Sequence, residues 1–290
     1  MAAPTLVRPL IVIVGPTASG KSNVAIELAE QYGGEIISAD SRTIYRHMDI
    51  GTAKPTAEDQ ARVPHWGLDI VEPGESFSAA DFKRYAVKKI AEIRSRGHVP
   101  FLVGGTGLYV DAVMFDYQFG PAADPEEREK WEGMSLEALH MYCIQNNIPL
   151  PENSQNKRYV IRAIEQQGVS AKRSKQPIDD TIIVGIATDR EQLRERIHMR
   201  SEHLFDDGVV DEAKRLGGQY GWDSEAMTGN IYRLARDFLD TKITLNEFKK
   251  RNETADWHLA KRQLTWLKRN EYIEWLTLEE VKNYIAQRLA

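Results

Sequence analysis

The sequence predicts an α/β protein, with a P-loop NTPase-like parallel sheet flanked by helices and interrupted by an all-helical insertion. Three observations support this fold class. The aliphatic run Leu10–Val14 leads directly into the glycine-rich motif Gly15–Ser22. Strand and helix patterns then alternate, as in folds built from right-handed crossovers. Residues 120–176 lack a strand signal, so we expect a discontinuous core of residues 1–119 and 177–290 around a helical insertion domain of residues 120–176.

Each element of the expected core has a local signal. The β-branched run 10–14 is typical of a strand buried on both faces, and residues 22–32 carry apolar residues at helical spacing. A second strand is expected at 33–40, a helix capped by Ser78 over 78–97, and a third strand over 98–107 that runs into a glycine turn. The strand pattern resumes at 181–189, and the remainder of the chain is expected to be helical.

The composition indicates a folded protein without a membrane span. Hydrophobic residues make up 42% of the 290 residues, which is enough for a real core, and no apolar run reaches 18 residues. We therefore expect a soluble, cytoplasmic protein. Its one cysteine, Cys143, excludes an internal disulfide and is expected to be a packing residue. The net charge of −5 argues against a globally basic nucleic-acid binder, but basic residues cluster locally near 157–175, 190–200 and 249–269.

The glycine-rich motif predicts a binding site for phosphate groups. It fits the pattern G-x-x-x-x-G-K-[ST] between a strand and a helix, where backbone N–H groups and the helix dipole can hold an anion. The expected phosphate- or diphosphate-binding residues are Gly15, Pro16, Thr17, Ala18, Ser19, Gly20, Lys21 and Ser22. Lys21 would reach the outer phosphate, and Ser22 could hold Mg²⁺. The motif alone does not distinguish ATP or another nucleotide from a different diphosphate.

Two further features are expected at the same edge of the sheet. Asp40 ends the second expected strand, so it should lie in the crevice beside the phosphate loop. At this level it is a candidate for a Mg²⁺ ligand, a general base or a helix cap. The turn Gly104–Gly107 follows the third strand and is expected either to face the ligand or to be a plain tight turn.

Several blocks of the sequence together resemble one enzyme family. The blocks are GPTASGKS, SADSRTIYRHMDIGTAKP, SFSAADF, VGGTGLYVDA, ADPEER, RYVIRAIE and AKRQLTWLKR, in this order. They are similar to the tRNA dimethylallyltransferases, the bacterial-type tRNA isopentenyltransferase family. The resemblance implies transfer of a dimethylallyl group from dimethylallyl diphosphate to N6 of the adenosine 3′-adjacent to the anticodon. It also implies that the insertion is a tRNA-binding subdomain that grips the anticodon stem-loop.

The resemblance also assigns roles to individual residues. Asp40 would be the base that accepts the N6 proton, while Thr17, Lys21 and Arg200 would hold the pyrophosphate as it leaves, with Mg²⁺ bridging. The residues implied for tRNA contact are Asp40, Ser41, Arg42, Thr43, Thr106, Arg128, Arg158, Arg162, Thr228, Arg233, Lys261, Arg262, Gln263 and Trp266. The chain departs from the family pattern at Thr43, Tyr159 and Ile231.

Other functions remain open at this level. An adenylate isopentenyltransferase would use the same loop but prenylate a free nucleotide. A P-loop kinase would consume ATP, and a nucleotide-gated RNA-binding module would catalyse nothing. The basic insertion and the segment AKRQLTW favour tRNA as the acceptor, and we expect the enzyme to act as a monomer.

Overall fold

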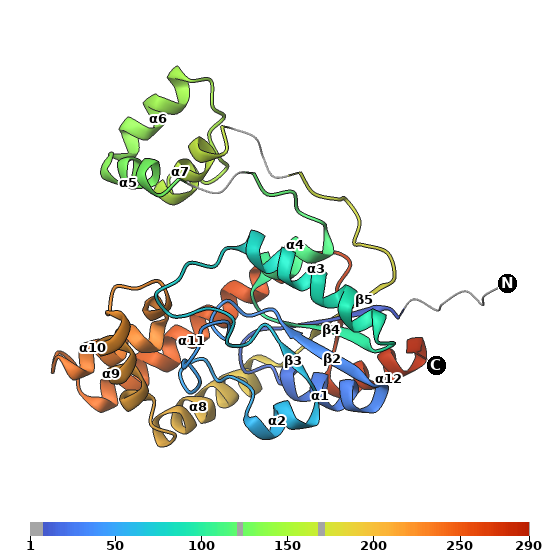
Figure 1. Cartoon of the computed structure of the whole chain (residues 1–290). Coiled ribbons are helices and arrows are strands. Elements are labelled where there is room, and N and C mark those ends of the chain that lie inside the picture. Colours follow the sequence, from blue (N-terminus) through green and yellow to red (C-terminus); the bar gives the residue numbers. More distant parts are fainter. Residues whose placement is uncertain (1–7, 121–123, 168–171, 290) are drawn as a thin grey trace. The chain divides into compact units, whose positions relative to one another are not determined.

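The computed structural model describes residues 8–120, 124–167 and 172–289 (Figure 1). The chain divides into two units, residues 1–114 with 177–290, and residues 115–176. Within the described residues the larger unit contains one sheet of six strands in the order β3-β2-β4-β1-β5-β6, and every pair is parallel. The strands are β1 Leu10–Val14, β2 Gly34–Ser38, β3 His65–Trp66, β4 Val99–Gly104, β5 Thr181–Ile186 and β6 Glu274–Leu276. The predicted parallel α/β core is confirmed.

Helices cover both faces of this sheet. Figure 1 shows α3 and α4 on one side of the sheet and α1 and α12 on the other. The first helices of the larger unit are α1 Lys21–Tyr32, α2 Ala57–Arg62, α3 Ala79–Ser95 and α4 Gly107–Met114. Those that follow β5 are α8 Arg190–Asp206, α9 Val209–Tyr220, the short 3-10 helix η1 Ala226–Thr228, α10 Asn230–Leu239, α11 Leu245–Leu267 and α12 Leu278–Leu289.

The sequence explains why these elements form where they do. All five residues of β1 are fully buried, as expected for a central strand with helices on both sides. One core cluster joins β1, β4 and β5 to α1 and α12, through residues such as Ile13, Phe101 and Ile285. Ser78 begins α3 in a capping box with Asp81, in which each side chain accepts a hydrogen bond from the other's backbone N–H.

Two short strands were missed by the sequence reading. The expectation that the chain is helical after residue 189 is wrong at β6, which adds three residues to the sheet beside β5. β3 adds two residues beside β2 at the opposite edge. Both are too short, and too exposed, to show a period of two residues.

A second core lies among the helices after β5. It joins α9, η1, α10 and the start of α11 to the segment that follows β2, with Met48, Tyr232 and Phe248 fully or almost fully buried at its centre. This core fixes the segment 44–48 to the helices and so anchors the chain just beyond Asp40.

The smaller unit has its own compact core. It contains α5 Pro125–Gly133, α6 Leu136–Gln145 and α7 Lys157–Glu165. Trp131, Leu139, Cys143, Val160 and Ile161 pack together between these helices. Cys143 is fully buried, in agreement with its predicted packing role, and burial raises the pKa of its thiol. Throughout the described residues, every helix is too short or too polar to cross a lipid bilayer.

Candidate functional site

The glycine-rich loop lies between β1 and α1 at the carboxyl edge of the sheet. Ala18 and Gly20 adopt positive φ angles of 60° and 87°, the kind of backbone conformation from which anion-binding loops are built. A Cβ atom at Gly15 would lie 2.7 Å from the Ser19 hydroxyl oxygen, so a larger residue there would force the Ser19 side chain to move. The Ser19 hydroxyl is buried and has no hydrogen-bond partner among the described residues. An unpaired buried hydroxyl in such a loop fits a site that holds a polar ligand.

Lys21 points back into the loop. Its Nζ donates a hydrogen bond to the Pro16 carbonyl oxygen at 3.2 Å. The pKa of Lys21 is lowered from 10.5 to about 8; burial is the main cause, Asp40 opposes the change, and the neighbouring Arg200 contributes to it. Lys21, Arg200 and Asp40 therefore lie close enough to influence one another's charge.

Helix α8 brings two guanidinium groups to the same loop. Arg200 Nη1 donates a hydrogen bond to Thr17 Oγ1, and Arg200 Nε is buried without a partner among the described residues. Arg196 Nη1 donates to the Ser19 carbonyl oxygen at 3.0 Å. The placement of Arg200 agrees with the sequence reading, whereas the contact of Arg196 with the loop was not anticipated. The loop is consequently ringed by cations that could bind a polyanion.

Asp40 follows β2 and faces this loop across the carboxyl edge. Its Oδ1 accepts a hydrogen bond from the Arg42 backbone N–H at 2.8 Å, which fixes the plane of the carboxylate. The next peptide is held by Thr106, whose hydroxyl accepts from the Ser41 N–H at 3.1 Å. Thr106 N–H in turn donates to the Ala39 carbonyl oxygen at 3.2 Å. The turn after β4 therefore supports Asp40, in line with the expectation that both segments share one edge.

Gly104 is the residue that permits this close approach. A Cβ atom there would lie only 2.1 Å from the Ala39 carbonyl oxygen. Any side chain at this position would push the Asp40 segment away from the turn, because the obstacle is backbone rather than a movable side chain.

Helix α11 packs its C-terminal half against both loops. The Thr17 backbone N–H donates a hydrogen bond to Gln263 Oε1 at 2.7 Å. Trp266 Nε1 donates to Asp111 Oδ2 at 2.7 Å, and its indole lies so close to Gly107 that a Cβ there would be 2.1 Å away. Lys261 and Arg262 are exposed. The residues predicted for tRNA contact on α11 therefore divide into exposed cations and two side chains that bind the protein itself.

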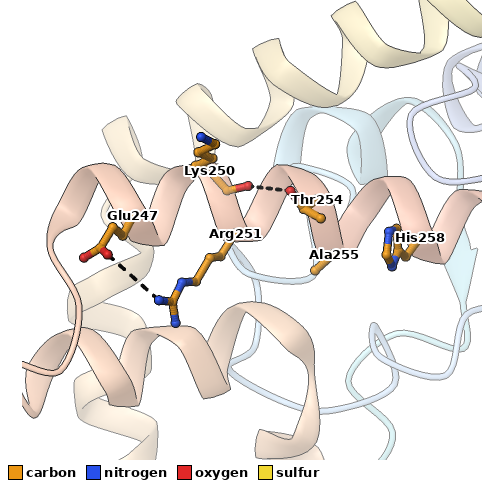
Figure 2. A pocket seen from close by; sticks show the side chains of 6 residues that line it. All are labelled: Glu247, Lys250, Arg251, Thr254, Ala255 and His258. Atoms are coloured by element: carbon orange, nitrogen blue, oxygen red, sulfur yellow. Dashed lines mark hydrogen bonds and ion pairs between the residues drawn. The ribbon is translucent and has the colours of Figure 1, made fainter.

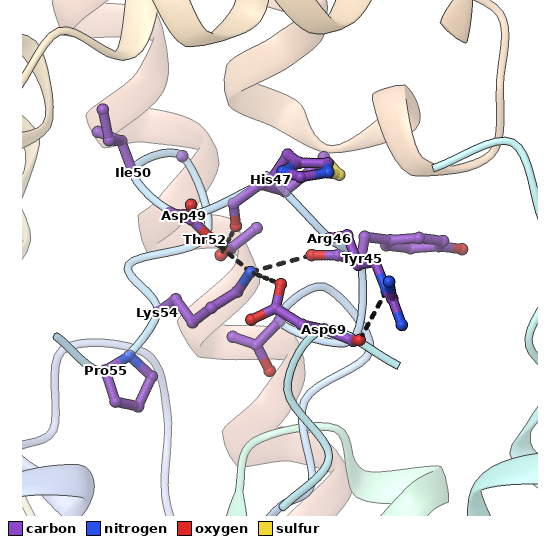
Figure 3. Close-up of polar contacts among 12 residues, drawn as sticks. Tyr45, Arg46, His47, Asp49, Ile50, Thr52, Lys54, Pro55 and Asp69 are labelled. Carbon is purple, nitrogen blue, oxygen red and sulfur yellow. Dashed lines mark hydrogen bonds and ion pairs between the residues drawn. The ribbon is translucent and has the colours of Figure 1, made fainter. Parts of the chain in front are cut away.

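The segment after Asp40 is held by a buried cation (Figure 3). Only 3% of the Lys54 side chain is exposed, and its Nζ donates hydrogen bonds to the Tyr45 carbonyl oxygen at 3.0 Å, Asp49 Oδ1 at 2.6 Å and Asp69 Oδ1 at 2.7 Å. Two carboxylates and a carbonyl accept hydrogen bonds from all three protons of the ammonium group. The buried positive charge is therefore balanced by nearby negative charge.

The other side of this segment is held by a buried carboxylate. Glu212 on α9 accepts hydrogen bonds from the backbone N–H groups of Asp49, Ile50 and Gly51 at 2.8, 2.8 and 2.9 Å. It also accepts from the Tyr232 hydroxyl at 2.8 Å, and burial and this carboxylate raise the pKa of Tyr232. Residues 49–51 therefore have a fixed backbone although they form no helix or strand.

Further residues of the predicted RNA set lie near the start of this segment. Arg42 donates hydrogen bonds to the Glu225 carbonyl oxygen at 3.1 Å and to the Thr228 hydroxyl at 3.3 Å. Thr43 is buried, and its hydroxyl lies 3.1 Å from that of Ser38. Ile231 packs in the helical core, and Arg233 is exposed. Thr43 and Ile231, two of the departures from the family pattern, are therefore packing residues in this chain.

In the smaller unit, two of the three predicted arginines share one carboxylate. Arg128 and Arg162 donate to the two oxygens of Glu165 at 2.9 and 3.0 Å, and only 4% of the Glu165 side chain is exposed. Arg158 is exposed and has no ion-pair partner among the described residues, and Tyr159 beside it is 51% exposed. The exposed face of α7 thus presents one unpaired cation beside an aromatic ring.

The opposite face of α11 carries a separate open hollow (Figure 2). Its volume is about 550 Å³, and its lining residues are Glu247, Lys250, Arg251, Thr254, Ala255 and His258. None of these residues contacts the glycine-rich loop in the described structure. The hollow is therefore a feature of the solvent side of α11, distinct from the loop site.

Sequence reasoning missed several polar residues that build the site. Arg196, Glu212 and Asp256 lie on helices whose exposed faces are rich in charge, so their inward direction is not evident from composition. Asn252 and Asp256 are both buried and lie four residues apart on α11, between Phe248 and Ala260. This spacing puts both polar side chains on the packed stripe of the helix. It is the sequence signal from which Asn252 and Asp256 could have been predicted to be buried.

A glycine-rich loop with a partly buried lysine, facing a carboxylate at the carboxyl edge of a parallel sheet, defines a P-loop α/β enzyme core that acts on a phosphorylated substrate. Comparison with known proteins narrows this class. The family model for IPP transferase matches residues 43–270, and the chain belongs to this family. The family resemblance of the sequence is thus confirmed.

Individual relatives match almost the whole chain. The chain is 37% identical to a tRNA dimethylallyltransferase of Bacillus velezensis, over 98% of this chain and 97% of the relative. It is similar in structure to the full-length tRNA isopentenylpyrophosphate transferase of Bacillus halodurans, with a TM-score of 0.75, 37% identity and 97% coverage of each chain. A eukaryotic dimethylallyltransferase solved while acting on tRNA shares the fold, with a TM-score of 0.78, 21% identity, and 93% and 74% coverage.

Proposed function

We propose that this chain is a tRNA dimethylallyltransferase that prenylates N6 of the adenosine 3′-adjacent to the anticodon. A bond forms between N6 and the allylic carbon of dimethylallyl diphosphate, and the carbon–oxygen bond to the diphosphate breaks. The electron pair of that bond leaves with pyrophosphate, and one N6 proton passes to a base. The observation that carries the proposal is the 37% identity to tRNA dimethylallyltransferases along nearly the full length of both chains.

The leaving group is stabilised by the ring of donors around the glycine-rich loop. Negative charge grows on the diphosphate as the allylic carbon becomes cationic. Lys21, Arg200 and the loop N–H groups supply positive charge in a partly buried place, where it acts more strongly than in water. Thr17, whose hydroxyl is held by Arg200, fixes the direction of that guanidinium.

Asp40 is the proposed base. The Arg42 N–H holds one carboxylate oxygen, and no described residue donates a hydrogen bond to the other. The second oxygen is therefore available for the N6 proton. A positioned base of this kind contributes about 10²–10⁴-fold to the rate. Because Asp40 lies beside Lys21, the N6 amine that it deprotonates would lie next to the departing diphosphate.

The loop residues also fit a magnesium ion. Mg²⁺ takes few protein ligands and completes its shell with substrate phosphates and water. Among the described residues, the one group of three metal-binding side chains, His198, Glu202 and Glu253, includes no loop residue. At the loop the donors to the ion would be the Ser22 hydroxyl and diphosphate oxygens, and such an oxygen set suits Mg²⁺ rather than zinc. When bound, the ion would neutralise charge on the diphosphate.

The RNA is proposed to contact two kinds of residue. Exposed cations, namely Arg158, Arg233, Lys261 and Arg262, would contact phosphates. The residues that surround Asp40 in the crevice, Ser41, Arg42, Thr106 and Thr228, would accommodate the target nucleotide after it leaves the stack, with the buried Thr43 packed behind them. Trp266 supports this part of the crevice through its hydrogen bond to Asp111. The smaller unit would grip the anticodon stem with Arg158 and with Arg128 and Arg162, which share Glu165.

We also propose that the enzyme acts in the cytoplasm and as a monomer. The substrates, tRNA and dimethylallyl diphosphate, are soluble molecules, and the loop residues and Asp40 all come from one chain. Sedimentation at assay concentrations would reveal a different assembly.

A labelling experiment tests the function. Dimethylallyl diphosphate labelled in the dimethylallyl group is offered with unmodified tRNA and, separately, with AMP. Label is expected in the tRNA alone, at the adenosine after the anticodon. Label in AMP but not tRNA would identify a nucleotide prenyltransferase, ATP consumption with neither would identify a kinase, and RNA binding without turnover would identify a binding module.

A further inference from the structure

The packed side of helix α11 is unusually polar. Phe248, Ala260 and Leu267 are buried as expected, but Asn252 and Asp256 on the same stripe are also buried. A helix ordinarily buries apolar residues on such a stripe, because each buried polar group needs a partner. The polar side chains of this stripe, with Gln263 further along the helix, therefore indicate a role other than packing.

Their partners lead toward the glycine-rich loop. Asn252 Nδ2 donates to the Ser201 hydroxyl on α8 at 3.2 Å. Asp256 lies beside Arg200; burial raises the pKa of this carboxyl, and Arg200 opposes the change. Gln263 reaches the loop itself, through the hydrogen bond from Thr17 N–H. Along α11, Asn252 and Asp256 therefore lie against α8, and Gln263, further toward the C-terminus, contacts the glycine-rich loop.

The Gln263 side chain is confined on two sides. Its Oε1 accepts from Thr17 N–H, whereas its Nε2 lies where a Cβ on Gly105 would come within 2.4 Å. The same position on Gly105 would be 3.1 Å from the Gly15 carbonyl oxygen. The amide is therefore wedged between the loop after β1 and the turn after β4, and glycine at residue 105 makes the space for it.

This contact changes which donors the loop offers. In a phosphate loop each free backbone N–H is a potential ligand donor. Here the Thr17 N–H is committed to Gln263, and the Thr17 hydroxyl is committed to Arg200. Two helices distant in sequence therefore fix the backbone of one loop residue from both its main chain and its side chain.

We infer that Gln263 is a positioning residue for the diphosphate loop and not a direct contact of the RNA. Its neighbours Lys261 and Arg262 are exposed, whereas Gln263 is half-buried against the loop. One turn of α11 thus carries both RNA-facing cations and a support for the diphosphate site. This inference rests on the proposed function, because it concerns the binding of dimethylallyl diphosphate.

Binding measured one substrate at a time separates the two roles. Gln263→Met keeps the length of the side chain and removes the acceptor. Thr265→Val is the matched control, since Thr265 is exposed on the same turn and its hydroxyl, within the described structure, bonds to the Lys261 carbonyl oxygen of its own helix. The affinity for pyrophosphate is measured without RNA, the affinity for unmodified tRNA without diphosphate, and the thermal midpoint for each variant.

For Gln263→Met we expect pyrophosphate binding to weaken about ten-fold, because a buried amide loses its partner and the loop its support. The KM for dimethylallyl diphosphate should rise, while the affinity for tRNA and the thermal midpoint stay near those of Thr265→Val. Unchanged pyrophosphate binding with weaker tRNA binding would overturn the inference in favour of an RNA contact. Equal losses of both affinities with a lower thermal midpoint would overturn it in favour of a general packing role.

Failure of the proposed function has a different signature. If the unaltered protein binds neither pyrophosphate nor dimethylallyl diphosphate, the loop does not serve a prenyl diphosphate, and the function and the inference both fall. If the unaltered protein binds both and only the Gln263→Met result is negative, the function stands and the inference alone is rejected.

Discussion

The charge of Lys21 should make diphosphate binding depend on pH. The pKa of Lys21 is lowered to about 8 in the free protein, chiefly by burial, so the ammonium is mostly charged near neutral pH and mostly neutral at about pH 9.5. A bound diphosphate favours the charged form. If only that form binds, the affinity for dimethylallyl diphosphate should be about 30-fold weaker at about pH 9.5 than at about pH 7.

The same pKa has a consequence for stability. The unfolded chain, with a pKa of 10.5, binds more protons than the folded chain between about pH 8 and 10.5, so the contribution of this group to stability rises with pH across that range. Below about pH 8 the buried cation costs on the order of 3 kcal/mol. Lys21→Met should therefore stabilise the ligand-free protein at neutral pH while it weakens diphosphate binding.

Titration calorimetry with dimethylallyl diphosphate at several pH values tests this reasoning. Lys21→Arg keeps its charge throughout and should bind with little pH dependence, and Lys21→Met should bind weakly at every pH. The reasoning is refuted if the unaltered protein varies less than about two-fold across the range. It is also refuted if Lys21→Met keeps the full pH dependence, since another group would then be titrating.

Three further predictions concern other parts of the structure. Asp40→Asn keeps an acceptor for the Arg42 N–H and should leave dimethylallyl diphosphate binding intact but lower the single-turnover rate by about 10²–10⁴-fold, and an unchanged rate would exclude Asp40 as the base. Arg158→Gln should reduce the slope of log affinity for tRNA against log salt by about one, as expected for a lost phosphate contact, and an unaltered slope would mean that this exposed residue does not contact the backbone. Glu212→Ala should cost on the order of 4 kcal/mol in urea unfolding, because three backbone N–H groups and a hydroxyl lose their acceptor, whereas Asp211→Ala on the exposed face should cost little; equal losses would contradict this.

The sequence predicted the parts of the fold that have strong local signals. The aliphatic run 10–14 and the Ser78 cap are signals of this kind, and the corresponding elements, β1 and α3, begin where expected. The position of Asp40 at the same edge as the glycine-rich loop followed from topology, since parallel strands end on one side of the sheet. β6 gave no signal, because three residues at a sheet edge show no periodicity.

The contacts within the site could not be predicted in the same way. Gln263 and Thr17 are separated by 246 residues, and nothing local in the segment KRQ indicates which side chain turns inward. The ion pairs of Arg128 and Arg162 with Glu165 likewise depend on how α5 and α7 pack. A basic run therefore predicts a charged surface, but packing decides which of its members remain available to a ligand.

The buried thiol of Cys143 offers a way to measure how often the smaller unit opens. It is the only cysteine in the chain, it is fully buried, and burial raises its pKa, so a thiol reagent can modify it only when the helices around it separate. The rate of its modification in the unaltered protein then measures how often this unit opens. Bound RNA that holds the unit closed would slow the reaction, and a second cysteine placed on the exposed face of α7 could be labelled selectively.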